Sequence, residues 1–366
     1  MQHPPTDTIH FHNVAAFEPA PSGGTYLRRF PHRIRKALSP LGRMVSEESA
    51  GVELRFVTES DNFLLTLGAE PSRLDPYETN PLTITLFRGD FVHSQRTVSA
   101  GRINPIQVTD IMGVLPERLA RINPEALKTC AFSPDVWRIC LGRFPATFIG
   151  LSTNHFPCRA PLPSEMPARR WLAYGSSITN GAGVIGHHLS YIYQAARLLH
   201  VDVYNQGLSG SCHCEPEMGD YLAARDDWDL ITLELGVNMR QKLTVEEFRE
   251  RATALVHRIA RAHPGKPVVV ISIYPNVDLA PYGHDASSEM ATKQAAFNNV
   301  LRELVVQGPA NLHFLDGSAI LGDFRNLSLD LIHPSDFGHI EMGRALAEKL
   351  SPLLEPDAVH SSISQL

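Results

Sequence analysis

The sequence predicts two domains of different architecture: an antiparallel β-sandwich of jelly-roll-like type over residues 1–165, then an α/β domain over residues 166–366. Three observations support this. A length of 366 residues suits two domains. The first part contains short segments in which apolar and polar residues alternate, which is typical of strands. After Arg170, apolar strands alternate with helix-length amphipathic segments, and this order predicts a parallel sheet.

A period of two residues identifies the strands of the first domain. Residues Val52 to Phe56 place three apolar side chains on one face, and Leu82 to Leu86 repeat the pattern. Three further segments continue it: Phe63–Leu67, Trp137–Leu141 and Thr147–Leu151. The proline-rich stretch Pro157–Pro167 is expected to be the linker.

The second domain is expected to hold five strands, at Trp171–Tyr174, Val201–Gln206, Asp229–Leu235, Pro267–Tyr274 and Asn311–Leu315. Thr244 and Glu247 form a capping box, because each side chain can pair with the backbone N–H of the other. The capping box predicts the start of a helix, and an apolar stripe continues it to about His263: Val245, Phe248, Ala252, Leu255, Val256 and Ile259. Two more helices are expected, at Met290–Val305 and Phe337–Leu350.

Composition excludes several classes of function. Lys and Arg number 33 against 39 Asp and Glu, and no dense basic run could neutralise phosphates, which argues against a nucleic-acid partner. No apolar run approaches the roughly 18 residues that cross a bilayer. Since Met1–Pro5 lack the layout of a secretory signal, we expect a cytoplasmic protein. Five cysteines make a disulfide framework unexpected, and Cys212–Glu215 are too closely spaced for a zinc site, so no metal is expected.

A short apolar strand at Trp171–Tyr174 ends in Gly175-Ser176-Ser177. A serine in a sharp turn after a buried strand has an exposed hydroxyl, and the backbone N–H beside it is free. Both features are what a nucleophile in acyl transfer needs. The turn therefore predicts a serine esterase.

A base and a partner for that base are found near the C-terminus. Asp330 and His333 lie between the last predicted strand and the last predicted helix, and their spacing lets carboxylate and imidazole project from one turn. The alternative interpretation is that His333-Pro334-Ser335 simply begins that helix.

Donors for an oxyanion are expected after two other strands. Asn205–Gly210 follow the second strand of the domain and Gly236–Asn238 follow the third. A glycine allows close approach of its backbone N–H, and an asparagine amide adds a second donor. Taken separately, each segment is also consistent with an ordinary turn at a strand end.

Four blocks of sequence, taken in order along the chain, resemble the motifs of the SGNH (GDSL) hydrolase family: Gly175–Ile178, Asn205–Gly210, Gly236–Asn238 and Asp330–His333. The resemblance covers about the last 200 residues. The resemblance implies a flavodoxin-like sheet, with Ser177 as nucleophile, His333 as base and Asp330 as its orienting partner. It also implies an oxyanion hole made by the Ser177 N–H, the Gly210 N–H and the Asn238 amide, and no cofactor. The two-domain layout resembles that of carbohydrate esterases and related acyltransferases.

The sequence departs from the family pattern at two positions. Ser176 stands where the family usually has aspartate, which leaves Ser176 as the alternative nucleophile. Met239 stands where a second aspartate is common, and we expect Met239 and Arg240 to face the acyl or acceptor pocket. The alternative for Arg240 is an exposed side chain with no role.

Two other classes of function fit the sequence less well. Gly181–Gly186 match the dinucleotide-binding fingerprint, but the glycines do not directly follow the strand and the acidic residue expected at the end of Val201–Gln206 is missing. A sugar-binding protein with a silent site would be expected to show more exposed aromatic residues. We therefore expect an esterase that acts on small acyl groups, acetyl on a sugar being one candidate, with an acyltransferase as the alternative. Acyl chain, acceptor and oligomeric state are left open.

Overall fold

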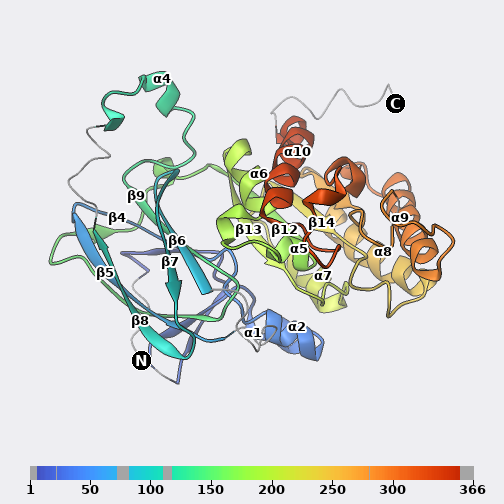
Figure 1. Ribbon diagram of the computed structural model, residues 1–366, viewed down its shortest axis with the longest axis horizontal. Helices are drawn as coiled ribbons and strands as arrows, with labels where there is room; N and C mark the ends of the chain where they lie inside the picture. Colours follow the sequence, from blue (N-terminus) through green and yellow to red (C-terminus); the bar gives the residue numbers. More distant parts are fainter. Residues whose placement is uncertain (1–5, 22, 72–81, 110–117, 280, 355–366) are drawn as a thin grey trace. The chain divides into compact units, whose positions relative to one another are not determined.

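The computed structural model describes residues 6–21, 23–71, 82–109, 118–279 and 281–354, and it contains two compact units (Figure 1). Unit 1 comprises the chain up to Arg35, Arg43–Ala168 and Ile185–His188. Unit 2 comprises Lys36–Gly42, Arg169–Val184 and the chain from Leu189 onward. The residues Met1–Pro5, on which the expectation of a cytoplasmic protein rests, lie outside the described ranges. None of the helices in these ranges is long and apolar enough to cross a bilayer.

Unit 1 is built from two antiparallel sheets, which confirms the predicted β-sandwich. The first sheet has the order β1-β4-β9-β6-β7, with β11 paired to β4. Its strands are β1 His10–His12, β4 Glu53–Thr58, β9 Val136–Leu141, β6 Leu82–Arg88, β7 Phe91–Val98 and β11 Cys158–Arg159. The second has the order β2-β3-β10-β5-β8, with β2 Ala16–Pro19, β3 Thr25–Arg28, β10 Ala146–Ser152, β5 Asn62–Ala69 and β8 Arg102–Thr109. The N-terminal half of the chain also contains the short helices α1 His32–Ala37, α2 Pro40–Val45 and α4 Pro124–Leu127, of which α1 and α2 overlap the segment Lys36–Gly42 of unit 2.

The core of unit 1 contains apolar residues from both sheets, including edge-to-face contacts of Phe63 with Phe56 and Trp137. Strand β4 differs from the expectation of one buried and one exposed face. Glu53 and Arg55 on its second face are also buried, because Glu53 pairs with both Arg55 and Arg138 at 2.8 Å. Burial opposes the ionisation of Glu53, but the two guanidinium groups hold its pKa well below the usual range.

Unit 2 contains a parallel sheet of order β13-β12-β14-β15-β16, which confirms the flavodoxin-like prediction. The strands are β12 Arg169–Gly175, β13 Val201–Gly207, β14 Leu230–Glu234, β15 Val268–Ile271 and β16 Leu312–Leu315. Because the chain begins this sheet at β12 and later strands are added on both sides of it, the carboxyl end of β12 is the topological switch point. Ligands bind at such points in open α/β sheets.

The helices of unit 2 are α5 Ser177–Asn180, α6 Tyr191–Leu199, α7 Pro216–Ala223, α8 Val245–Ala262, α9 Glu289–Val306 and α10 Asp336–Leu354. Helix α8 begins with the predicted capping box, in which the Glu247 N–H donates to Thr244 Oγ1 at 3.2 Å and the Thr244 N–H donates to Glu247 Oε2 at 2.7 Å. Helices α6 and α10 pack against each other and share one apolar cluster with Trp171 and Ala173 of β12.

Two segments differ from their predicted boundaries. Strand β15 is shorter than expected, because the Ile273 N–H donates to the side chain of Asn298 at 3.0 Å rather than to a neighbouring strand. The expected linker Pro157–Pro167 contains β11 and a 3₁₀ turn at Pro163–Glu165. Glu165 in that turn accepts from the Leu162 N–H and from the Arg159 guanidinium.

Candidate active site

The turn after β12 carries Ser177 at the first position of the short helix α5. A side chain at Gly175 would overlap Thr179 Oγ1 and lie 2.7 Å from Glu234 Oε2, so only glycine lets these groups approach. Ser176 is the N-cap of α5, and its hydroxyl accepts from the Ile178 N–H at 3.2 Å. The side chain of Ser176 therefore caps the N-terminus of α5, and that of Ser177, the next residue, is not used in the cap.

The structure brings three predicted site residues into one hydrogen-bonded chain. Ser177 Oγ lies 2.7 Å from His333 Nε2, and His333 Nδ1 lies 2.6 Å from Asp330 Oδ2. The Ser176 side chain has the Ile178 N–H and the Glu234 carboxylate as its partners instead, and Ser176 is only 1% exposed. The geometry therefore favours Ser177 over Ser176 as the group that His333 can deprotonate.

Asp330 is held by several donors besides the imidazole. Its Oδ1 accepts from the N–H groups of Ile332 at 3.0 Å and His333 at 2.9 Å, and the Ser328 hydroxyl lies 3.1 Å away. Burial opposes its ionisation, but the hydrogen bonds from His333 and the backbone outweigh that effect and lower the pKa of Asp330 to about 2. Asp330 is thus an ionised acceptor near neutral pH. Leu331, with φ +54°, supplies the left-handed residue of this tight loop.

The predicted oxyanion donors are available. Within the described ranges, neither the Ser177 N–H, the Gly210 N–H nor the Asn238 amide nitrogen has a hydrogen-bond acceptor. The oxygen of Asn238 accepts from the Cys212 N–H at 3.1 Å, so the side chain is oriented with its NH₂ group left to donate elsewhere. Gly210 has φ +65°, which favours glycine there.

The loop that carries Gly210 is tied to the serine turn. The Leu208 N–H donates to the Gly175 carbonyl at 2.8 Å, and Asn180 Nδ2 donates to Ser209 Oγ at 3.0 Å. A side chain on Gly207 would overlap the Asn180 backbone, so Gly207 is what lets α5 pack on the end of β13. These contacts join two of the four predicted blocks directly.

Met239 and Arg240 follow β14 and are both buried. Arg240 is only 7% exposed, which excludes the alternative of an exposed arginine. It donates to Gln294 Oε1 at 3.1 Å and lies 3.8 Å from Asp278, and burial lowers its pKa despite that carboxylate. Contact of Arg240 or Met239 with substrate stays a prediction.

The glycines of the apparent dinucleotide fingerprint have other uses. Gly181 ends α5 with φ +87°, and Gly183 has φ +99°. A side chain at Gly183 would overlap the Pro334 carbonyl, next to His333. The first two glycines of the pattern therefore end the serine helix and let it approach the histidine loop.

Sequence reasoning missed three side chains that support the site: Ser328 beside Asp330, and Glu234 and Thr179 beneath the serine turn. A signal for Glu234 was present, since it is a charged residue inside the apolar run Leu230–Leu235. It is 1% exposed, and burial raises its pKa to about 7 against the hydrogen bonds from Ser176 and Thr179.

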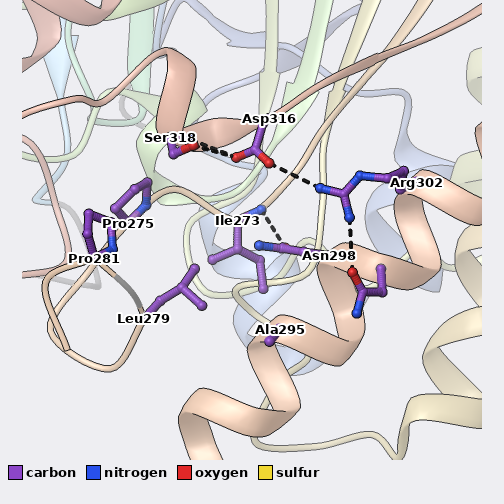
Figure 2. A pocket seen from close by; sticks show the side chains of 10 residues that line it. Ile273, Pro275, Leu279, Pro281, Ala295, Asn298, Arg302, Asp316 and Ser318 are labelled. Carbon is purple, nitrogen blue, oxygen red and sulfur yellow. Dashed lines mark hydrogen bonds and ion pairs between the residues drawn. The ribbon is translucent and has the colours of Figure 1, made fainter. Parts of the chain in front are cut away.

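A separate cavity of about 350 Å³ lies at the carboxyl ends of β15 and β16, beside α9 (Figure 2). Figure 2 shows Asp316 joined to both Ser318 and Arg302, facing an apolar wall that includes Leu279. None of the four predicted blocks lines this cavity.

Comparison with known proteins identifies the α/β unit. Residues 168–351, half of the chain, match the model of the GDSL-like lipase/acylhydrolase family. No curated protein matches the chain.

Several solved structures share the two-domain fold. The chain is similar to a salicylyl-acyltransferase, SsfX3, from a tetracycline biosynthetic pathway, with a TM-score of 0.77 at 17% identity over 95% of this chain and 96% of that one. A family two carbohydrate esterase from Cellvibrio japonicus gives 0.58 at 15% identity over 95% of each chain. The corresponding esterase from Clostridium thermocellum, solved with cellohexaose, gives 0.57 at 13% identity over 93% and 98%. At these identities the similarity shows the fold alone, but with the family match over half its length the chain belongs to the GDSL-like lipase/acylhydrolase family, an assignment that supports acyl ester hydrolysis or transfer as its chemistry.

Proposed function

We propose that this protein is a serine esterase that hydrolyses esters of small acyl groups through an acyl-Ser177 intermediate. The observation that carries this proposal is the continuous chain of hydrogen bonds from Ser177 Oγ through His333 to Asp330. The family match supports the reaction class.

In the acylation step, Ser177 Oγ attacks the carbonyl carbon of the ester while its proton moves to His333 Nε2. Asp330, ionised near neutral pH, accepts from Nδ1 and stabilises the imidazolium that forms. The carbonyl oxygen becomes an oxyanion, for which the N–H groups of Ser177 and Gly210 and the Asn238 amide are the proposed donors. The carbon–oxygen bond of the ester then breaks, and the leaving alcohol takes the proton from Nε2.

Deacylation repeats these steps with a second nucleophile. His333 removes a proton from water, the hydroxide oxygen attacks the acyl carbon, and Ser177 Oγ leaves and recovers its proton. If an alcohol replaces water, the same residues carry out acyl transfer. The similarity to the salicylyl-acyltransferase over nearly the whole of both chains favours transfer as the second candidate.

If the protein is an esterase, we propose that its substrate is an acetyl ester of a carbohydrate. It is supported by the two-domain carbohydrate esterases among the similar structures, one of which was solved with cellohexaose. Under this proposal Met239 and Arg240, next to Asn238, contribute to binding of substrate.

The test is hydrolysis of p-nitrophenyl acetate by wild type, Ser177→Ala and Ser176→Ala, with the acetyl-enzyme followed by intact mass. The proposal requires turnover and an acetyl adduct in wild type, neither in Ser177→Ala, and an adduct in Ser176→Ala. An adduct in Ser177→Ala would assign the nucleophile to Ser176. Adding glycerol separates the two candidates: a stable wild-type adduct that only the alcohol discharges indicates a transferase, whereas release in water alone indicates an esterase.

A further inference from the structure

The carboxylate of Glu234 lies beneath the turn that carries the proposed nucleophile. Glu234 is the last residue of β14, which pairs with β12 in the sheet. Its Oε2 accepts from the Ser176 N–H at 2.7 Å and from Thr179 Oγ1 at 3.1 Å. One carboxylate oxygen therefore contacts residues on both sides of Ser177.

The packing around this carboxylate leaves little freedom. A side chain at Gly175 would lie 2.7 Å from Glu234 Oε2 and 2.9 Å from Glu234 Cβ, so the strand end approaches it as closely as a glycine permits. Thr179 Oγ1 also lies 2.8 Å from the Tyr191 hydroxyl, which extends the contact to α6. A change at Glu234 should therefore be transmitted to the position of the turn.

No cation compensates the charge of Glu234 within the described part of the chain. Its Oε1 has no hydrogen-bond partner there, and no lysine, arginine or histidine pairs with the carboxylate. The titratable groups that face it are Tyr191 on α6, Tyr274 after β15 and Cys212 after β13. A buried carboxylate without a cation costs stability, so it is a poor choice for packing alone.

We propose that Glu234 is a positioning residue whose carboxylate holds the Ser176–Thr179 turn so that the Ser177 hydroxyl stays at His333. This inference rests on the proposed function, since it assumes that Ser177 is the nucleophile. Glu234 does not touch the reacting atoms; it acts through the backbone N–H and side chain of Ser176 and the hydroxyl of Thr179.

The ionised form of Glu234 should be the effective one, because a carboxylate accepts hydrogen bonds more strongly than a carboxylic acid. Burial raises the pKa of Glu234 to about 7, so its ionisation falls in the working range. Part of the acid limb of the pH profile in wild type then comes from the ionisation of Glu234, and Glu234→Gln lacks that part.

Ionisation of Glu234 raises activity as pH increases but lowers the stability of the folded state. A carboxyl whose pKa is raised on folding favours the folded state at low pH, and that contribution is lost as pH rises from its ordinary value of 4.5 through about 7. Glutamine at this position does not titrate. The melting temperature of Glu234→Gln relative to wild type should therefore rise as pH increases through this window.

The experiment measures phosphonylation of Ser177 by diisopropyl fluorophosphate, followed by intact mass at several pH values on both sides of about 7, in wild type, Ser177→Ala and Glu234→Gln. We expect Glu234→Gln to react roughly tenfold more slowly at alkaline pH, the equivalent of one weakened hydrogen bond, with a shallower acid limb. Glu341→Gln, which removes an exposed carboxylate on α10, is the matched control and should react like wild type.

A second pair of variants tests the inference even if Glu234→Gln does not fold. Thr179→Val removes one donor to the carboxylate, so the acid limb should move to higher pH, and Thr179→Ser should restore it. Glu234→Gln with the rate and limb shape of wild type would overturn the inference, as would an unmoved limb in Thr179→Val. Wild type that is not labelled, or Ser177→Ala labelled equally fast, would overturn the proposed function and the inference with it.

Discussion

At the scale of single residues, the site depends on which groups stay charged. Against the effect of burial, hydrogen bonds from His333 and the backbone lower the pKa of Asp330 to about 2, so it remains ionised near neutral pH. The backbone hydrogen bonds from Ile332 and His333 to Oδ1 that lower this pKa also hold the carboxylate where Oδ2 lies 2.6 Å from His333 Nδ1. Asp330 therefore does not contribute to the acid limb of activity, to which Glu234 contributes by our inference.

Asp330→Asn should reduce kcat for p-nitrophenyl acetate by about a thousandfold or more, because an amide can donate to Nδ1 and favour the wrong imidazole tautomer. Ser328→Ala is the matched change in the same loop. It removes only one of several donors to Asp330, and we expect it to lose less than tenfold. Near-normal turnover in Asp330→Asn would show that another group orients His333.

Asn238→Ala should reduce kcat by about 10²–10³-fold with little effect on KM, because an oxyanion donor acts mainly in the transition state. Asn238→Asp retains an oxygen for the Cys212 N–H but places a negative charge where the oxyanion forms, so a larger loss is expected. Steady-state kinetics of both variants provide the check. A change confined to KM would instead indicate that Asn238 binds the ground state.

Much of the candidate site was predictable from residue types and their order. Ser177 follows the end of β12, and Asp330 and His333 lie in the connection between the last strand β16 and the last helix α10. Connections that leave the carboxyl ends of parallel strands meet at one edge of the sheet. The buried support was not predictable in the same way. Glu234 lies in a strand whose other residues are mostly apolar. Its contact with Thr179 cannot be predicted from the sequence, since the two residues meet only when β12 and β14 pair.

At the scale of elements, the N-caps of α8 and α5 should both affect stability, but only the cap of α5 should also affect activity. Thr244→Ala should destabilise α8 by about 1 kcal/mol through loss of the capping box and lower the melting temperature by a few degrees, with unchanged turnover. Ser176→Ala removes the equivalent cap of α5, which carries Ser177, and should lower turnover as well. Thermal melts and kinetics on both variants test this; equal effects on turnover would contradict it.

Element boundaries show where sequence patterns are sufficient. The capping box and apolar stripe predicted α8 closely, because both signals are local. The end of β15 depends on the side chain of Asn298 on a distant helix, and the second buried face of β4 depends on the pairing of Glu53 with Arg138 on β9. Contacts between segments far apart in the chain are invisible to a periodicity argument.

At the scale of the whole molecule, the sequence predicts that catalysis resides in residues 166–366, but unit 2 also includes Lys36–Gly42 from the N-terminal part. A side chain on Gly210 would lie 2.9 Å from Leu41 Cδ2, and Ser39 Oγ lies 3.5 Å from Ser211 Oγ. The segment therefore packs on the loop that carries a proposed oxyanion donor.

A fragment of residues 166–366 lacks this cover, so we expect it to react more slowly with diisopropyl fluorophosphate than the full chain does. In the full chain, Leu41→Ala should reproduce part of the loss, by less than tenfold, because it removes the apolar contact and leaves the Gly210 backbone in place. Labelling rates and melting temperatures of the three proteins separate a local effect from loss of folding. If the fragment and Leu41→Ala both react at the rate of the full chain, residues 166–366 are sufficient to position the Gly210 N–H, and Lys36–Gly42 add no more than surface packing.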